Sequence, residues 1–265
     1  MSNIASFFDI DGTIARESLM IEHFKRLIKY EILDESIWVN DVKQLYMEYV
    51  NRYGAYDAYI EALAEKYITD LKGFDVEYNK FIAEQSVQKV CERVYLFSRN
   101  QLEFHKKNGH LIFFVSGSPD FLVEEMAKKY DITEYRATKY LYDENGKFNG
   151  EILPMWDSEN KDRVCKELIE KYDIDIEKSF AYGDTTGDLS MLRRFGNAYT
   201  INPSKRLLEK IKNDEEYEVE IVEDNPNSAD NRYWYNVKSR NKDIEGIYKT
   251  PYNLKEKINR IVLEQ

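Results

Sequence analysis

The sequence predicts an α/β protein with a Rossmann-like parallel sheet core flanked by helices and with an inserted, mostly α-helical domain. Three observations lead to this prediction. Short apolar segments end at residues 8, 115 and 182, and each runs directly into polar residues typical of a strand end. Helical periodicity follows each of them. Between the first two, about 80 residues show a helical but no strand-like pattern, which indicates an insertion into the sheet.

The composition is that of a globular protein with a sizeable core. Of 265 residues, 43% are hydrophobic, which argues against a largely disordered chain. The 38 basic and 49 acidic residues give a net charge of −11, which argues against a surface for nucleic acid or an anionic membrane. A small anionic substrate is still compatible with this charge, because a few donors and a metal can reverse the potential inside one cleft.

Cysteine usage and apolar runs predict a soluble protein of a reducing compartment, the cytoplasm. Cys91 and Cys165 form no Cys-x-x-Cys pair, and Cys165 is expected to be a buried structural thiol. Asp9 and Asp11 interrupt the only early apolar run, so no signal peptide is expected. The longest later run, residues 111–115, is too short to span a bilayer.

The first apolar segment, residues 4–8, is followed by Asp9, Asp11, Gly12 and Thr13. Ligands of open α/β sheets bind beyond the carboxyl ends of the strands, so these groups are expected to line a site. Two unpaired carboxylates held close together repel each other, so the pair needs a nearby cation. The alternative interpretation is an acidic turn after a strand.

The predicted helical insertion covers residues 17–99, and the discontinuous core comprises residues 1–16 and 100–265. Ser18 is a possible N-cap of its first helix, and residues 41–67 and 76–107 follow a helical period, the second run broken once. Tyrosines at 46, 49, 53 and 56 form one stripe. Packing between helices explains this stripe most simply, and an aromatic cage for a substrate cation is the alternative.

The second strand is predicted over residues 110–115 and ends at Ser116 and Gly117. Ser118 suits the N-cap and Pro119 the first turn of the helix that follows. A helix start offers unpaired N–H groups and a partial positive charge, which bind phosphate or carboxylate. The same junction is also common where no ligand binds.

Further along the chain, a lysine at a helix start and two carboxylates beyond a strand end are candidate site residues. Lys161 lies in the first turn of a helix predicted over residues 158–172, where the helix dipole disfavours a cation. This placement suggests an anionic partner, although exposed lysines at helix starts are common. The third strand, residues 179–182, precedes Asp184 and Asp188, so carboxylates again stand beyond a strand end.

Local signals place four more elements. An Asn-Gly pair at residues 145–146 predicts a β-hairpin. A helix over residues 189–195 is expected to end at Gly196 as a C-cap. In the tail, residues 217–222 alternate like a strand and residues 254–263 form an amphipathic helix. The pattern indicates no function for this tail. An added layer of the core explains it more simply than a surface for a partner.

Three strand ends thus carry polar groups of one chemical type. Carboxylates occur at positions 9, 11, 184 and 188 and hydroxyls at 13 and 116, with Lys161 on a helix start. Oxygen ligands without histidine or cysteine select a hard cation, and Mg²⁺ is the usual one where phosphate also binds. His23, His105 and His110 lie outside these strand ends, which argues against a zinc site or a histidine base.

The order of these groups resembles the four motifs of the haloacid dehalogenase-like superfamily of phosphohydrolases, over about residues 4–205. The matching residues are Asp9-Ile10-Asp11-Gly12-Thr13, then Ser116, then Lys161, then Gly183-Asp184-Thr185-Thr186-Gly187-Asp188. The helical insertion after the first motif resembles the cap of the phosphoserine-phosphatase-like branch. The motifs are specific for the superfamily and say little about the substrate.

The resemblance implies a covalent mechanism. Asp9 would attack phosphorus, and Asp11 would protonate the leaving group and then deprotonate water. Mg²⁺ would be held by Asp9, the main-chain carbonyl of Asp11 and Asp184, with Asp188 nearby. The groups implied to hold the phosphoryl oxygens are Thr13, Ser116, the Gly117 amide and Lys161. The cap would close over the site and exclude bulk water.

Two positions depart from the family pattern. Ser18 stands where a glutamate of phosphoserine phosphatases reads the substrate amine, and Gly187 replaces an asparagine that commonly precedes the last aspartate. We therefore predict a Mg²⁺-dependent phosphomonoesterase of a small phosphorylated metabolite, with phosphoserine phosphatase proper as the alternative. A non-catalytic binding module is expected to lack the nucleophile or the lysine, and both are present. Phosphoryl transfer to an acceptor other than water is a further alternative.

Overall fold

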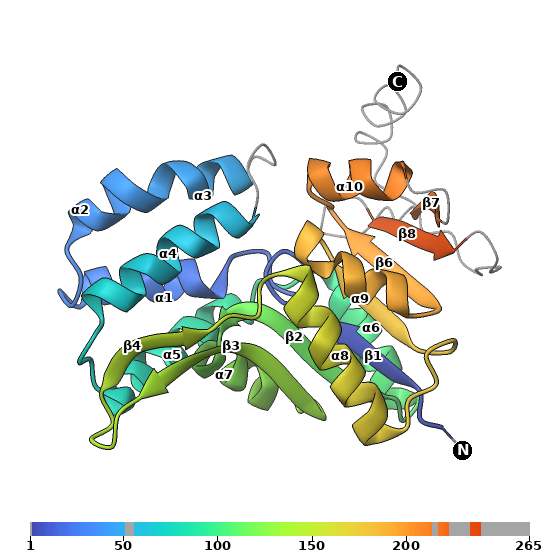
Figure 1. Cartoon of the computed structure of the whole chain (residues 1–265), viewed down its shortest axis with the longest axis horizontal. Coiled ribbons are helices and arrows are strands. Elements are labelled where there is room, and N and C mark those ends of the chain that lie inside the picture. The colour runs from blue at the N-terminus through green and yellow to red at the C-terminus, as the bar shows by residue number, and fades with distance from the viewer. Residues whose placement is uncertain (1, 51–55, 214–216, 223–233, 240–265) are drawn as a thin grey trace.

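A computed structural model describes residues 2–50, 56–213, 217–222 and 234–239 (Figure 1). These residues form one eight-stranded sheet in the order β4-β3-β2-β1-β5-β6-β8-β7. Five central strands run parallel, whereas β4, β8 and β7 pair antiparallel at the edges. The strands are β1 (Ala5–Phe8), β2 (Leu111–Pro119), β3 (Glu134–Tyr142), β4 (Phe148–Leu153), β5 (Phe180–Gly183), β6 (Asn197–Ile201), β7 (Tyr217–Val222) and β8 (Trp234–Ser239). The predicted α/β class is confirmed.

Helices cover both faces of the sheet, because successive strand residues point to opposite sides. On one face, Phe8 stacks on Tyr182 with ring centroids 4.1 Å apart, beside α6 (Leu96–Lys107) and α7 (Asp120–Tyr130). On the other face, Phe7 stacks on Phe195 at 4.3 Å. The helices of this second face are α8 (Ser158–Tyr172), α9 (Leu189–Arg194) and α10 (Lys205–Lys212). Cys165 of α8 is buried among them, as predicted.

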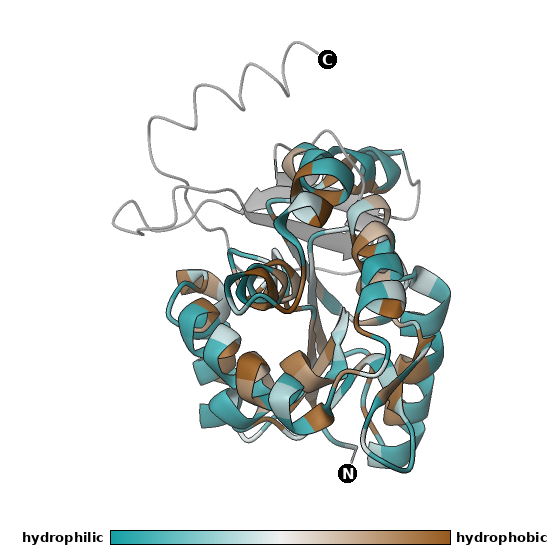
Figure 2. Cartoon of the chain, turned by 90° about the vertical axis from the view of Figure 1, so that its left-hand side faces the viewer, coloured by the Kyte–Doolittle hydropathy of each residue, from teal (hydrophilic) through white to brown (hydrophobic). Residues whose placement is uncertain are grey.

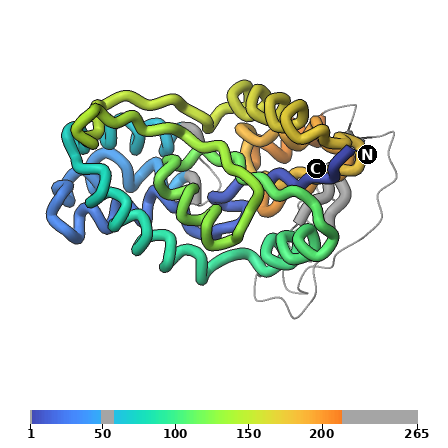
Figure 3. The backbone as a smooth tube through the Cα atoms, turned by 90° about the horizontal axis from the view of Figure 1, so that it is seen from below, coloured from blue at the N-terminus to red at the C-terminus, as the bar shows by residue number. Residues whose placement is uncertain are grey.

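The helices between β1 and α6 gather mainly at one side of the sheet (Figures 1 and 3). They are α1 (Leu19–Lys29), α2 (Glu35–Ile37), a π-helical segment (Trp38–Val42), α3 (Lys43–Val50), α4 (Tyr56–Asp70) and α5 (Val76–Val90). Apolar and polar residues alternate around the helices of the molecule (Figure 2). The apolar side chains of this group join the same buried cluster as Phe8 and Phe114, so the core continues from the sheet into the inserted helices.

The β3–β4 hairpin lies along the inserted helices (Figure 1). Its turn is at the predicted Asn-Gly pair, where Gly146 has a φ of +71° that favours glycine. The amide of Phe148 donates to the Phe74 carbonyl at 2.9 Å, and Lys147 Nζ lies 2.8 Å from Asp75 Oδ2. The hairpin therefore binds the loop between α4 and α5 to the sheet.

The predicted tyrosine stripe is only partly described. Tyr46 packs against Trp38 and against Tyr59, each with ring centroids 5.7 Å apart, which supports helix packing for this ring. The side chains at positions 49, 53 and 56 lie outside the described residues, as does the predicted helix over 254–263. In the part of the chain that the structure describes, no helix has the length and apolarity of a membrane span.

Two local predictions are wrong. β2 runs on to Pro119 and α7 begins at Asp120, so Ser118 is the penultimate residue of a strand and no N-cap. Gly196 follows α9 (Leu189–Arg194) where a left-handed C-cap glycine would stand, but its φ is not positive. Glycine is required at 196 by close approach instead, because a Cβ there would lie 1.9 Å from the Glu177 carbonyl oxygen.

Two histidines are buried within the helical layers. His105 Nε2 lies 3.0 Å from the Tyr182 hydroxyl, and His105 Nδ1 lies 2.9 Å from His110 Nδ1. His23 Nδ1 lies 2.8 Å from the Tyr67 hydroxyl. Burial lowers the pKa of His23 and that of His105 to about 3 each, so both rings are neutral in the folded protein near neutral pH.

Acidification is therefore expected to destabilise the fold. Because the folded-state pKa values of His23 and His105 are depressed, their stabilising contribution is complete above the unfolded value of 6.5 and is lost as pH falls towards about 3. At about pH 5 each histidine should lower the free energy of unfolding by about 2 kcal/mol. Chemical denaturation at about pH 7 and about pH 5 measures the effect. A His105→Gln variant should lose less stability on acidification; an unchanged loss would contradict the assignment.

Candidate active site

Asp9 follows β1 directly and lies beside the end of β5. Its amide donates to the Tyr182 carbonyl at 2.9 Å, which extends the β1–β5 pairing by one residue. The chain then turns back on itself. Gly12 has a φ of +83°, and the amides of Ile14 and Ala15 both donate to the Ile10 carbonyl. This turn leaves the Asp9 side chain at the carboxyl end of the sheet.

Lys161 forms ion pairs with carboxylates that follow two different strands, β1 and β5. Its Nζ lies 2.7 Å from Asp9 Oδ1 and 2.6 Å from Asp188 Oδ1, and the lysine is only 2% exposed. Burial alone would lower the pKa of Lys161, but the attraction of Asp188 and Asp9 outweighs it and raises that pKa above its usual range. The ammonium group therefore stays charged, as the unusual helix-start placement suggested.

Asp188 organises the turn after β5. Its Oδ2 accepts hydrogen bonds from the Asp184 amide at 3.0 Å, the Thr185 amide at 2.9 Å and the Thr185 hydroxyl at 3.2 Å. Gly183 leaves room for it, since a Cβ at 183 would lie 2.5 Å from the Asp188 Cβ. With Oδ1 on Lys161, both oxygens of Asp188 are engaged.

Three buried carboxylates form a group that suits a metal. Asp9, Asp184 and Asp188 each offer an oxygen, and these oxygens lie within 4.8 Å of one another. Burial raises the pKa of Asp9 well above its usual range; Lys161 opposes this, and the repulsion of Asp188 and Asp184 adds to it. When all three carboxylates are ionised, as a bound cation favours, Lys161 offsets only one of their three charges. An all-oxygen donor set with excess negative charge fits Mg²⁺.

Thr13 and Asp11 belong to the turn after β1, and their side chains contact different neighbours. The Thr13 hydroxyl donates to Asp184 Oδ1 at 3.2 Å, so it contacts the carboxylate group directly. Asp11 Oδ1 accepts from the Leu19 amide at 2.9 Å, and its Oδ2 accepts from the Ser118 hydroxyl at 2.5 Å. The Asp11 carboxylate therefore faces the start of α1 and the end of β2.

Ser116 and Gly117 reach the same end of the sheet through β2. Phe114 pairs with Phe8, so Ser116, two residues further along β2, lies level with the turn that follows β1. Ser116 is buried, and its Oγ accepts from the Ser118 amide at 3.2 Å. The Gly117 carbonyl accepts from the Thr138 hydroxyl at 2.8 Å, which fixes the strand end against β3.

The two departures from the family pattern have structural explanations. Ser18 is buried and caps α1, accepting from the Ile21 amide at 3.4 Å. The nearby acids are paired as well: Glu17 with Arg93 at 2.8 Å, and the buried Glu22 with Lys89 at 2.8 Å. At 187, a Cβ would lie 2.4 Å from the Trp156 carbonyl oxygen, so no asparagine side chain fits there without a shift of the chain.

Two residues of the site were not predicted. Thr185 holds Asp188, and Ser118 bonds to Asp11. Thr185 stands inside a recognised motif, so its position was a usable signal. The Ser118-Pro119 pair has the local pattern of a helix start, and nothing in the sequence shows that its hydroxyl faces a carboxylate 107 positions away.

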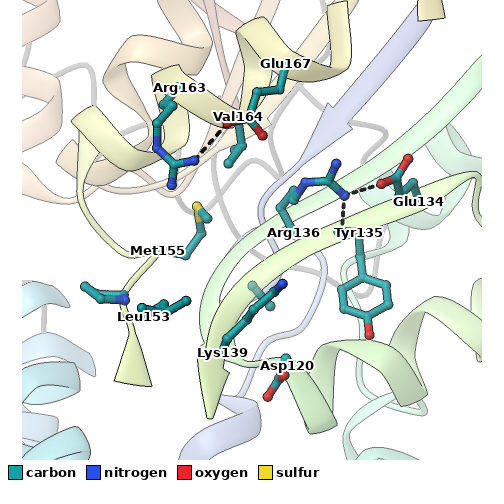
Figure 4. A pocket seen from close by; sticks show the side chains of 12 residues that line it. Asp120, Glu134, Tyr135, Arg136, Lys139, Leu153, Met155, Arg163, Val164 and Glu167 are labelled. Atoms are coloured by element: carbon teal, nitrogen blue, oxygen red, sulfur yellow. Dashed lines mark hydrogen bonds and ion pairs between the residues drawn. The ribbon is translucent and has the colours of Figure 1, made fainter. Parts of the chain in front are cut away.

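A cavity of about 460 Å³ beside α8 and β3 contains none of the predicted site residues (Figure 4). Arg163 pairs with Glu167, and Arg136 pairs with Glu134, as the dashed lines show. Because its acidic and basic side chains balance, this cavity has no excess positive charge for a phosphate. Its charged lining residues are Asp120, Glu134, Glu167, Arg136, Lys139 and Arg163.

Comparison with known proteins gives one family. A family model described as haloacid dehalogenase-like hydrolase matches residues 6–193. A probable phosphatase of Mycobacterium tuberculosis is 26% identical over 205 residues, covering 77% of this chain and 70% of that protein. A histidinol-phosphatase of Neisseria meningitidis is 22% identical over 221 residues, covering 80% and 96%.

Solved structures share the fold at low sequence identity. A Bordetella pertussis protein of unknown function superposes with a TM-score of 0.65 at 18% identity, covering 80% of this chain and 96% of that one. A phosphoserine phosphatase with a phospho-aspartyl intermediate analogue gives a TM-score of 0.58 at 18% identity, covering 79% and 91%.

Proposed function

The chain belongs to the haloacid dehalogenase-like hydrolases, and from this premise we propose that it is a phosphatase that hydrolyses a phosphate monoester through an aspartyl-phosphate on Asp9. The observation that carries this proposal is the buried ion pair of Lys161 with Asp9 and Asp188. It brings together three residues that lie at distant positions of the chain and that the motif order had singled out. The phosphatase names of the relatives agree with this function.

Asp9 is the proposed nucleophile. Lys161 holds its Oδ1, so the carboxylate can present its second oxygen to phosphorus. Attack by that oxygen forms the Asp9–phosphorus bond as the ester bond breaks, and Asp11 gives a proton to the leaving oxygen. Water then attacks the same phosphorus, gives its proton to Asp11 and releases Asp9 and inorganic phosphate. One difficult displacement is thus divided into two easier ones.

The remaining polar groups are proposed to bind the phosphoryl oxygens and the metal. Thr13, Ser116, the Gly117 amide and Lys161 would offset the charge on the transferring group. Asp9, Asp184, Asp188 and the main-chain carbonyl of Asp11 would hold Mg²⁺. When bound, Mg²⁺ supplies positive charge that lets a phosphate approach anionic Asp9.

We assign residues 17–99 the role of a cap over this site. Three observations support this role: the Leu19 amide bonds to Asp11, α1 starts at Leu19 shortly after the first motif, and Lys147 of the β3–β4 hairpin pairs with Asp75 of the insertion. A closed cap excludes bulk water from the aspartyl-phosphate until Asp11 activates one molecule.

The proposed substrate is a small phosphorylated metabolite. Phosphoserine is a second candidate, because a phosphoserine phosphatase of M. tuberculosis is among the relatives, at 21% identity. The capping role of Ser18 and the pairing of Glu17 and Glu22 disfavour it, since none of the three is set to read an amine. Phosphate release from a panel that includes phosphoserine and histidinol phosphate tests the proposal; release from no member would reject it.

Removing divalent metal is expected to abolish hydrolysis of 4-nitrophenyl phosphate, and added Mg²⁺ should restore it. The reason is the uncompensated charge of the Asp9, Asp184 and Asp188 group. An Asp184→Asn variant should need roughly tenfold more Mg²⁺ for half-maximal rate, because it removes one anionic ligand. Rates measured after chelation and during Mg²⁺ titration decide the point. Activity that ignores the chelator would remove the metal from the mechanism.

A further inference from the structure

We propose that Ser118 is a positioning residue for the general acid and base Asp11, an inference that rests on the proposed function. Ser118 holds the carboxyl group of Asp11 through its hydroxyl and stays unchanged by the reaction. It is distinct from Ser116, which is proposed to bind the transferring phosphoryl group.

The contact between the two side chains is short and buried. Ser118 Oγ lies 2.5 Å from Asp11 Oδ2, and both residues are at most 1% exposed. From the other side, the Leu19 amide donates to Asp11 Oδ1 at 2.9 Å. Two donors on the two oxygens fix the plane of the carboxyl group, because rotation about its terminal bond would break both hydrogen bonds.

Ser118 is itself held firmly. Its amide donates to Ser116 Oγ at 3.2 Å. The carbonyl of the neighbouring Gly117 accepts from the Thr138 hydroxyl at 2.8 Å, and the oxygen of that hydroxyl accepts from the Met155 amide at 3.1 Å. The end of β2 is thus fixed by β3 and by the loop before α8. The Ser118 hydroxyl therefore extends from a fixed main chain and can set the orientation of Asp11.

The chemistry of Asp11 requires such an orientation. A carboxylate has about four lone-pair sites, and the hydroxyl of Ser118 and the amide of Leu19 use two of them. Hydrogen bonds from these two donors are therefore compatible with a proton on a further site, which Asp11 gives to the leaving oxygen and later takes from water. General acid or base catalysis depends on proton transfer over hydrogen-bond distance, so a carboxyl group that rotates freely loses part of its effect.

Leaving-group dependence provides the test. The proposal predicts that Ser118→Ala lowers kcat/KM for phenyl phosphate by roughly tenfold to a hundredfold and that for 4-nitrophenyl phosphate by less than about threefold. Phenol is a weak acid, with a pKa of about 10 like that of tyrosine, and needs a proton to depart. The more acidic 4-nitrophenol departs as an anion. The value of kcat/KM covers the steps up to loss of the leaving group. A loss of proton donation by Asp11 therefore lowers it mainly for phenyl phosphate, whereas general damage to the site lowers it for both esters. Ser118→Thr, which keeps the hydroxyl, should restore most of the phenyl phosphate rate.

Two serine variants serve as controls. Ser116→Ala should lower kcat/KM for both esters by a similar factor, because Ser116 is proposed to contact the phosphoryl group that both share. Ser86→Ala also removes a buried hydroxyl, one that bonds to the Ile82 carbonyl within α5, and should change neither rate.

The outcomes distinguish the two proposals. Equal losses for the two esters in Ser118→Ala, or no loss for either, would overturn the role of Ser118 alone. Hydrolysis that survives in Asp9→Asn, or its absence in the wild-type protein with Mg²⁺, would overturn the aspartyl-phosphate mechanism and the role of Ser118 with it.

Discussion

Replacing Asp9 with asparagine is expected to lower the kcat for 4-nitrophenyl phosphate by roughly a thousandfold or more. The amide has nearly the shape of the carboxylate but lacks its negative charge and is a far weaker nucleophile. The loss should come from kcat, because the phosphoryl-binding groups proposed at Thr13, Ser116 and Lys161 are still present. Steady-state kinetics measures this, and mass spectrometry of trapped wild-type protein should find the phosphoryl group on the peptide that contains Asp9.

The same substitution should leave the fold intact. Burial, together with the repulsion of Asp188 and Asp184, outweighs the attraction of Lys161 and raises the pKa of Asp9, so removing its charge relieves a net unfavourable interaction in the absence of metal. We expect an unchanged or slightly higher unfolding temperature for Asp9→Asn. Asp131→Asn is the matched control, since this exposed residue has a φ of 47°, a conformation that asparagine tolerates well. Near-normal turnover in folded Asp9→Asn would contradict the nucleophile assignment.

The sequence revealed most of the fold because its signals are local. The apolar segment before Asp9, the N-cap Ser18 and the Asn-Gly turn before Lys147 each act within a few residues, and the structure has these elements where they were expected. The meeting of Asp9 with Asp184 and Asp188 followed from a rule about strand ends in parallel sheets. That of Lys161 with Asp9, 152 positions apart, followed from its unusual place at a helix start and from the motif order. Its distances and burial could not be read from spacing.

The errors arose where tertiary contacts override local preference. Ser118-Pro119 has the pattern of a helix start, but Asp11 accepts a hydrogen bond from the Ser118 hydroxyl, and β2 continues through both residues. Gly196 follows a helix as a C-cap glycine would, yet what it provides is room for the Glu177 carbonyl. In each case the deciding neighbour is distant in sequence, and no local propensity encodes it. The docking of the hairpin on the inserted helices was missed for the same reason.

Replacing Lys161 with methionine is expected to reduce both activity and stability. Methionine fills a similar volume without charge, so Asp9 and Asp188 lose the ammonium group that lies within 2.7 Å of each of them. Breaking a buried ion pair from one side typically costs about 3–5 kcal/mol. The kcat/KM for phenyl phosphate should fall at least roughly a hundredfold, because the same group is proposed to offset charge on the transferring phosphoryl oxygens. Denaturant unfolding and steady-state kinetics measure the two losses separately.

Metal and a control lysine sharpen this test. Added Mg²⁺ should recover part of the lost stability of Lys161→Met, since the cation offsets charge in the same carboxylate group, but it should not recover the rate. Lys166→Met removes an exposed lysine of the same helix that pairs with Asp162, and it should cost less than about 1 kcal/mol. If Lys161→Met were as stable as Lys166→Met without metal, the buried pair would contribute little. Rate recovery by Mg²⁺ alone would mean that the lysine serves charge balance and leaves the phosphoryl group to other donors.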